Sequence, residues 1–131
     1  MRKLFFIMIL GLMAFAGCQT TAPKKNQVQN VEHKNIVLND EKTLSKAIIK
    51  GAVRRKWVIT ETSEGVIIAE LNIRSHWVKV EILYGKDYYA ILYKDSKNLG
   101  YKAKKQTIHP NYNRWIKYLE RSINTAIAEE L

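Results

Sequence analysis

The stretch 76–84 constrains the fold most, because its residues alternate between two faces from one position to the next. One face carries His76, Val78, Val80, Ile82 and Tyr84, and the opposite face carries Trp77, Lys79, Glu81 and Leu83. A period of two residues is typical of a β-strand with one covered face and one face partly open to water. We therefore expect this strand to lie inside an antiparallel sheet.

Three further stretches, 57–62, 66–73 and 88–94, are rich in β-branched and aromatic residues, which favour strands. The connections between the four stretches are short, and residues 63–65 and 85–87 contain the Gly, Ser or Asp typical of turns. Connections of this length can join only antiparallel neighbours. The pattern predicts a four-stranded antiparallel meander.

Helical periodicity precedes and follows these strands. Residues 40–55 carry one narrow apolar stripe behind Asn39, a suitable N-cap, and a stronger stripe recurs over residues 112–127. Either His109 or Asn111 caps the second helix. The order α-β-β-β-β-α predicts an α+β fold with both helices packed on one face of the sheet. Nucleic-acid-binding sheets of the RRM type have a different order, so we expect no nucleic-acid partner.

The N-terminus has the layout of a signal peptide. Arg2 and Lys3 precede an apolar run over residues 4–16. This run is shorter than the about 20 apolar residues that a helix needs to cross a bilayer. We therefore expect a cleaved leader, with an uncleaved membrane anchor or a plain secretory signal as the alternatives.

The leader ends in Phe15-Ala16-Gly17-Cys18, which contains the only cysteine of the chain. This motif resembles the lipobox of bacterial lipoprotein precursors, although Phe15 stands where that class usually has an aliphatic residue. The resemblance implies cleavage just before Cys18 and attachment of lipid to Cys18. In a Gram-negative cell, Gln19 after the acylated cysteine implies the outer membrane, with the domain facing the periplasm.

Removal of residues 1–17 would lower the net charge from +10 to +8, because it deletes two of the 22 basic residues and none of the 12 acidic ones. Residues 18–38 comprise the lipidated cysteine and a polar stretch without periodicity, which predicts a flexible tether with a reach of up to about 70 Å. Residues 36–38 could instead form a short edge strand. Residues 39–131 are expected to form the globular domain.

A basic loop over residues 95–107 contains Lys97, Lys102, Lys104 and Lys105, and Arg114 follows in the next helix. A loop of this length is usually functional or mobile. Its cations, together with the N–H groups of the helix start, would favour an anion such as a phosphate or a carboxylate. The alternative is a solvated surface that keeps a small domain soluble.

Two segments, 96–99 and 108–115, together resemble a group of small bacterial lipoproteins of unknown function, over about residues 44–127. The second segment reads Ile108-His109-Pro110-Asn111-Tyr112-Asn113-Arg114-Trp115. The resemblance implies no activity. Physically, the two aromatic residues Tyr112 and Trp115 are expected in the core, and Asn111 or Asn113 is expected to cap the helix.

No catalytic or metal-binding pattern is recognisable in the chain. The three histidines, His33, His76 and His109, are far apart, and no thiol remains once the cysteine is acylated. The glutamates of the predicted strands are expected on a salt-bridged surface. We therefore expect no enzymatic activity, no metal and no cofactor.

These observations favour a lipid-anchored, non-catalytic module of the cell envelope that binds anionic partners, such as lipid head groups, lipopolysaccharide or an acidic protein surface. The alternative is a protein-interaction subunit of an envelope assembly machine, which would use the outer sheet face around Trp77 and Leu83. The third hypothesis is an enzyme that acts on cell-wall sugar. It ranks last because the sequence shows no pair of carboxylates that such an enzyme would use.

Overall fold

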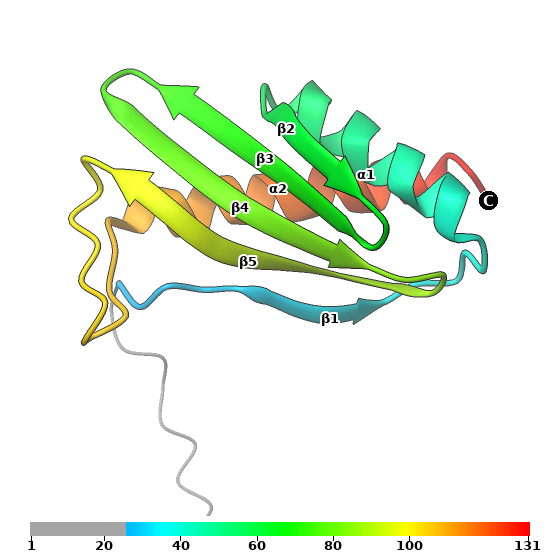
Figure 1. Ribbon diagram of the computed structural model, residues 1–131, viewed down its shortest axis with the longest axis horizontal. Helices are drawn as coiled ribbons and strands as arrows, with labels where there is room; N and C mark the ends of the chain where they lie inside the picture. The colour runs from blue at the N-terminus through cyan, green and yellow to red at the C-terminus, as the bar shows by residue number, and fades with distance from the viewer. Residues whose placement is uncertain (1–25) are drawn as a thin grey trace, which may run out of the picture.

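The computed structural model describes residues 26–131. The predictions for the leader, for Cys18 and for the first part of the tether lie outside these residues. The described residues form an α+β fold of five strands and two helices (Figure 1). In chain order these are β1 (Val31–Asn35), α1 (Glu41–Arg54), β2 (Val58–Ser63), β3 (Val66–Ile73), β4 (His76–Tyr84), β5 (Tyr88–Lys97) and α2 (Pro110–Ala128).

The strands form one antiparallel sheet in the order β1-β5-β4-β3-β2. The predicted meander from β2 to β5 is confirmed, with β4 at its centre, where Val80 pairs with Ala69 on one side and Tyr93 on the other. The β2–β3 turn contains Gly65 at φ +74°, a conformation that side chains with a Cβ rarely adopt. Short turns therefore set the order of these four strands, as the sequence predicts.

The prediction of a four-stranded sheet is wrong by one strand. The fifth strand, β1, pairs with β5 and comes from residues 31–35, which the sequence analysis assigned to the tether. Four of its five residues are exposed, so it has no apolar alternation to reveal it. The exposed His33 of this strand stacks on Tyr88 with ring centroids 4.4 Å apart. Backbone pairing and polar contacts hold this strand instead of a buried face.

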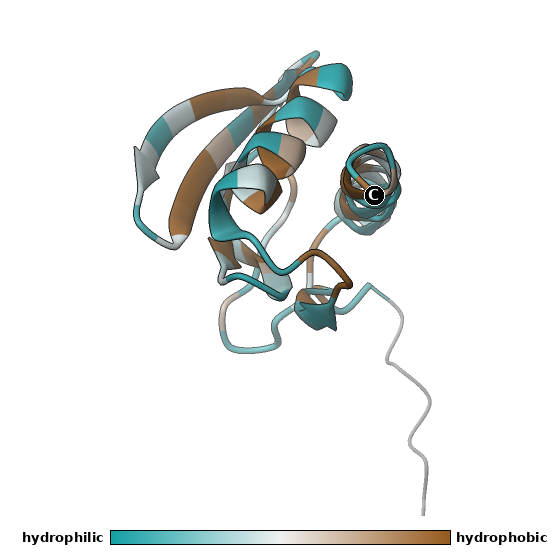
Figure 2. Ribbon diagram, turned by 90° about the vertical axis from the view of Figure 1, so that its right-hand side faces the viewer, coloured by the Kyte–Doolittle hydropathy of each residue, from teal (hydrophilic) through white to brown (hydrophobic). Residues whose placement is uncertain are grey.

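Both helices cover the same face of the sheet and pack against each other (Figures 1 and 2). The alternation predicted for β4 is confirmed, because Val78, Val80, Ile82 and Tyr84 are buried beneath the helices, while the residues between them are partly exposed. The buried stripes of α1 and α2 complete this single core. Within the described residues, neither helix is long and apolar enough to cross a membrane.

The helix caps differ in detail from the expectations. Asp40, not Asn39, caps α1, because its carboxylate accepts hydrogen bonds from the Lys42 N–H at 3.1 Å and the Thr43 hydroxyl at 2.6 Å. These two bonds lower the pKa of Asp40. His109 caps α2 and leaves Pro110 at the first helical position, so one of the two alternatives is selected.

A close contact joins the two helices. The hydroxyl of Ser122 donates to the Gly51 carbonyl at 2.7 Å, and a Cβ added to Gly51 would lie 2.6 Å from the backbone Cα of Ile123. The Glu129 carboxylate forms ion pairs with the Arg54 guanidinium at 2.9 Å and with the Lys50 ammonium at 2.7 Å. These two cations lower the pKa of Glu129 to about 2. Helix α1 therefore approaches α2 at a position where only glycine fits.

We predict that Gly51→Ala destabilises the fold by about 1–3 kcal/mol, because the new methyl group meets backbone atoms that cannot turn aside. This cost exceeds the roughly 0.5–1 kcal/mol that alanine gains over glycine as a helix former. Urea unfolding followed by circular dichroism measures the change. Lys46→Ala, on the exposed side of α1, is the matched control and should shift stability by less than about 0.5 kcal/mol. Equal stability of the two variants would show that the helices do not meet at Gly51.

Candidate functional site

The β3–β4 turn, the loop of residues 98–109 and the start of α2 meet at one end of the domain (Figure 1). Residues 96–119 contain six Lys or Arg residues and no Asp or Glu. We call this region the basic end. Its basic residues come from several elements, and the segment from the end of β5 to the middle of α2 contains no acidic residue.

The loop of residues 98–109 is pinned to the domain at both ends. Leu99 and Ile108 are each 2% exposed, and the His109 N–H donates to the Leu99 carbonyl at 2.8 Å. Between them, Lys102 and Thr107 exchange backbone hydrogen bonds, and the ring of Tyr101 lies 4.3 Å from that of Tyr93. Leu99, Ile108 and Tyr101 therefore anchor the loop to the domain.

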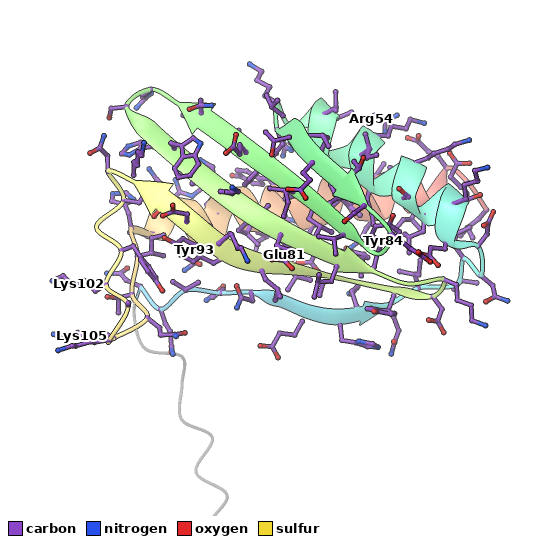
Figure 3. The ribbon with its side chains drawn as sticks, in the orientation of Figure 1. Arg54, Glu81, Tyr84, Tyr93, Lys102 and Lys105 are labelled. Carbon is purple, nitrogen blue, oxygen red and sulfur yellow. The ribbon has the colours of Figure 1, made fainter. Side chains whose placement is uncertain are left out.

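This closed loop presents three of the predicted lysines to solvent. Lys102, Lys104 and Lys105 are exposed, and Figure 3 shows Lys102 and Lys105 pointing away from the sheet. Among the described residues, the ion pairs involve Lys34, Lys50, Arg54 and Lys94, and none involves these three lysines. Their charges are therefore available to an external anion.

The first described residues of the chain lie against this same loop. The Asn26 carbonyl accepts from the Ile108 N–H at 2.9 Å, and the Val28 N–H donates to the Gln106 carbonyl at 2.8 Å. Gln27 forms a β-bridge with Thr107. The N-terminal segment therefore joins the basic end and then continues along the sheet as β1.

Asn113 of α2 clamps this segment with both ends of its amide. Its Oδ1 accepts from the Gln29 N–H at 2.9 Å, and its Nδ2 donates to the Gln27 carbonyl at 2.8 Å. Farther along, Asn30 Oδ1 accepts from the Tyr93 N–H at 3.0 Å. The expectation that Asn113 might cap α2 is wrong, because it serves as a backbone-like partner for a distant segment instead.

The docked segment shortens the free part of the expected tether. From Cys18 to Asn26 there are eight residue steps, which span at most about 28 Å when fully extended. This reach is shorter than the about 70 Å predicted for a tether over residues 18–38. The basic end is thus the part of the domain closest along the chain to the predicted lipid site.

Two of the predicted anion-binding residues lie apart from the loop lysines. Strand β5 extends to Lys97, whose ammonium lies over the ring of Trp77 on the outer sheet face, 5.4 Å from the centroid. Arg114 donates to Asn111 Oδ1 at 3.3 Å and lines a separate cavity. The structure therefore brings together only Lys102, Lys104 and Lys105 of the predicted set.

Two cavities open at the basic end. One, of about 420 Å³, lies between the loop and the start of α2 and includes Lys102 and His109 in its lining. The other, of about 270 Å³, is lined by Ile73, Arg74, His76, Asn111, Arg114 and Trp115. We call this second cavity the arginine cleft. The place of Arg74 in this cleft is not predictable from the sequence, because nothing local indicates that the β3–β4 turn faces α2.

His76 and His109 come together at the basic end despite their separation in sequence. Their ring centroids are 6.2 Å apart, and the His76 ring lies 5.9 Å from that of Trp115. His76 Nδ1 donates to the Asn98 carbonyl at 2.8 Å, whereas His109 Nδ1 accepts the Asn111 N–H at 3.1 Å. Among the described residues, no group of three or more His, Cys, Asp or Glu side chains is placed to hold a metal ion.

The outer sheet face has no helix over it (Figure 2). Trp77 and Leu83 are partly exposed there, and Leu83 lies between Val66 and Ala90 on the neighbouring strands. Glu81 on the same face pairs with Lys94 at 2.9 Å, consistent with the salt-bridged surface that was expected. The face is therefore a mixture of charged pairs and partly buried apolar residues.

Burial changes the acidity of the tyrosines beneath the basic end. Loss of hydration raises the pKa of Tyr112, which is buried, and of Tyr93, whose hydroxyl lies 2.7 Å from the Ser96 hydroxyl. These tyrosines support the loop from below, since the Tyr93 and Tyr112 rings meet edge to face with centroids 5.5 Å apart. They remain neutral and structural.

Comparison of the chain with protein-family models, with curated proteins and with solved structures finds no significant match to any of them.

We predict that Asn113→Ala releases the N-terminal segment without unfolding the domain. The substitution removes two hydrogen bonds, each worth about 0.5–1.5 kcal/mol, so amide exchange over residues 27–30 should accelerate by at least about fivefold. Hydrogen–deuterium exchange with mass spectrometry measures this rate. Asn111→Ala is the control, because Asn111 contacts Arg114 and not the segment. An unchanged exchange rate in Asn113→Ala would contradict the clamp.

Proposed function

We propose that this protein is a lipid-anchored, non-catalytic module of the bacterial cell envelope whose basic end binds the anionic surface of the membrane that carries it. The proposal rests on lipid attachment at Cys18, implied by the lipobox. The observation that carries it is the contact between residues 26–28 and the loop of Lys102, Lys104 and Lys105. This contact links the anchor and the charge at one end of the domain.

The chain geometry supports a fixed orientation at the membrane. The chain from Cys18 to Asn26 spans at most about 28 Å, so it would keep the loop lysines near the head groups. The opposite end, with the β4–β5 turn and the start of α1, would point away from the membrane (Figure 1). Strand β1 runs between the two ends, because the Ile36 N–H donates to the Asp87 carbonyl of the β4–β5 turn at 2.9 Å. The segment from Asn26 to Ile36 is thus held against the domain from the basic end to the β4–β5 turn.

The energetics favour this interaction. A basic residue near an anionic bilayer contributes about 1 kcal/mol when it lies within a Debye length of the surface, which is about 8 Å at physiological ionic strength. Three exposed lysines on one loop would together contribute about 3 kcal/mol. A lipid anchor already holds the protein at the membrane, so this modest sum is enough to orient it.

Phosphate-rich lipid head groups and lipopolysaccharide offer the same negative charge, and the account holds for either. An acidic protein surface is less well matched, because the three exposed lysines all belong to the single loop of residues 98–109 and not to a broad face. A protein interface usually needs a contiguous patch of several hundred Å².

The alternative function, a protein-interaction subunit that uses the outer sheet face, has one observation in its favour, namely that no helix covers this face. Trp77 is partly covered by Lys97, and Leu83 is not among the strongly exposed large apolar residues, which are Val37, Val53, Val58, Tyr101, Tyr118 and Leu131. Of these residues, only Val58 lies on the outer face, because it pairs with Glu70 of β3 at the β2 edge. The face therefore presents one exposed apolar side chain at its edge and little exposed apolar area around Trp77 and Leu83.

We predict that replacing Lys102, Lys104 and Lys105 with Gln weakens binding of residues 19–131 to anionic vesicles by roughly 10- to 100-fold, as expected for the loss of about 3 kcal/mol reduced by salt screening. Co-sedimentation with phosphatidylglycerol vesicles at low and high salt measures the effect, with phosphatidylcholine vesicles as the neutral reference. The unsubstituted fragment should lose its binding at high salt.

A second triple variant provides the matched control. Replacing Lys42, Lys46 and Lys86 with Gln removes the same charge from the opposite end, at the start of α1 and in the β4–β5 turn, and should leave vesicle binding nearly unchanged. If both triple variants lose affinity equally, net charge alone drives binding and the basic end has no special role. Absence of binding by the unsubstituted fragment would argue against the proposal altogether.

A further inference from the structure

We infer that the arginine cleft is a second, separate binding site, and that it takes a phosphorylated sugar. The cleft lies between the β3–β4 turn and the first turns of α2, and Arg74 and Arg114 enter it from these two different elements. This inference goes beyond membrane orientation by the loop, and it holds whether or not the loop lysines bind lipid.

The two arginines are available for an anion. Both are exposed, and neither forms an ion pair with a carboxylate within residues 26–131. The lining of the cleft contains no Asp or Glu. A guanidinium presents its N–H groups in a planar fork that matches phosphate oxygens two at a time. Two such groups on one cavity suit a dianionic phosphate monoester better than a single carboxylate.

The Arg114 side chain and the backbone that carries Arg74 are held in place before any ligand enters. Arg114 is steadied by its hydrogen bond to Asn111 Oδ1 at 3.3 Å. Arg74 has a left-handed backbone at φ 55°, and the turn that contains it is held by the Asn98 side chain, which donates to the Ser75 carbonyl at 2.7 Å. Preorganised groups bind with less loss of conformational freedom.

His76 connects the β3–β4 turn to the loop of residues 98–109. Its Nδ1 donates to the Asn98 carbonyl at 2.8 Å, so Nε2 is the ring nitrogen left for a ligand in the cleft. The start of α2 contributes little directly, because His109 already accepts the Asn111 N–H. Side chains, and not the helix terminus, therefore carry the recognition.

The remaining wall of the cleft consists of apolar residues. Trp115 and Ile73 line it, and both also line an adjacent apolar cavity of about 130 Å³ beside Trp57 and Tyr118. An indole ring packs well on the C–H face of a sugar, which inorganic phosphate lacks. The cleft volume of about 270 Å³ is slightly below the roughly 300–1,000 Å³ of typical small-molecule sites. One sugar ring with its phosphate fits this size.

The test uses the full-length protein in neutral detergent micelles, with glucose 6-phosphate as the probe and isothermal titration calorimetry as the measurement. We expect saturable binding of glucose 6-phosphate that is at least tenfold tighter than that of glucose and of inorganic phosphate. The double variant Arg74→Gln/Arg114→Gln should weaken it at least tenfold. Both arginines are exposed, so circular dichroism should show an unchanged fold.

The double variant Lys117→Gln/Arg121→Gln is the matched control, because it removes the same charge from the exposed side of α2 outside the cleft lining. It should keep its affinity within twofold. No saturable binding, equal loss in both double variants, or equal affinity for glucose 6-phosphate and inorganic phosphate would each overturn the inference.

A free sugar phosphate and a phosphorylated sugar of an envelope glycolipid share this chemistry. Competition by lipopolysaccharide against bound glucose 6-phosphate would identify the glycolipid as the source, and lack of competition would identify the free compound. Vesicle binding through the loop lysines is measured separately on phosphatidylglycerol, which carries no sugar, so failure of one proposal is distinguishable from failure of the other.

Discussion

Burial of one face of β4 beneath α1 and α2 is the constraint on which the rest of the structure depends. The apolar residues of this face, Val78, Val80 and Ile82, are fully buried. A shift of one residue would expose them and bury the charged face instead. The register of β3 and β5 follows from this, and the turns at the two ends of the sheet are then fixed in space. One of these ends becomes the basic end.

The periodic elements could be predicted from sequence because their signal is local. Apolar residues recur at every second position in β2 to β5 and at every third or fourth position in the two helices, because these residues are buried in the same core. Helix caps were predicted only to within one residue for α1, because Asn39 and Asp40 are both good capping residues. The choice between them depends on geometry that sequence does not contain.

Strand β1 and the Asn113 clamp could not be predicted, because they depend on contacts between distant parts of the chain. Gln29 and Asn113 are 84 residues apart, and both groups in this hydrogen bond are polar and partly exposed. A polar segment paired through its backbone has the same composition as a disordered one. The same reason explains the site: Arg74 and Arg114 belong to different elements, and only the folded chain brings them to one cleft.

These features make the two ends of the domain different. The described chain meets the basic loop at Asn26 and follows the edge of the sheet to the opposite end, so the described residue nearest along the chain to Cys18 lies at the same end as the loop lysines. The arginine cleft is at this end as well, formed by the β3–β4 turn and α2. A module that samples anionic groups close to its own membrane is consistent with all three.

The most direct test is to measure how far each end of the domain lies from the membrane when the full-length protein is bound to anionic vesicles through the lipid predicted at Cys18. A donor fluorophore is attached at Lys104→Cys or at Lys86→Cys, and energy transfer is measured to acceptors in the head groups of anionic vesicles. The ten residues of β5 separate the two ends by about 30 Å. The account predicts efficient transfer from position 104 and weak transfer from position 86. Equal transfer from both positions would contradict it.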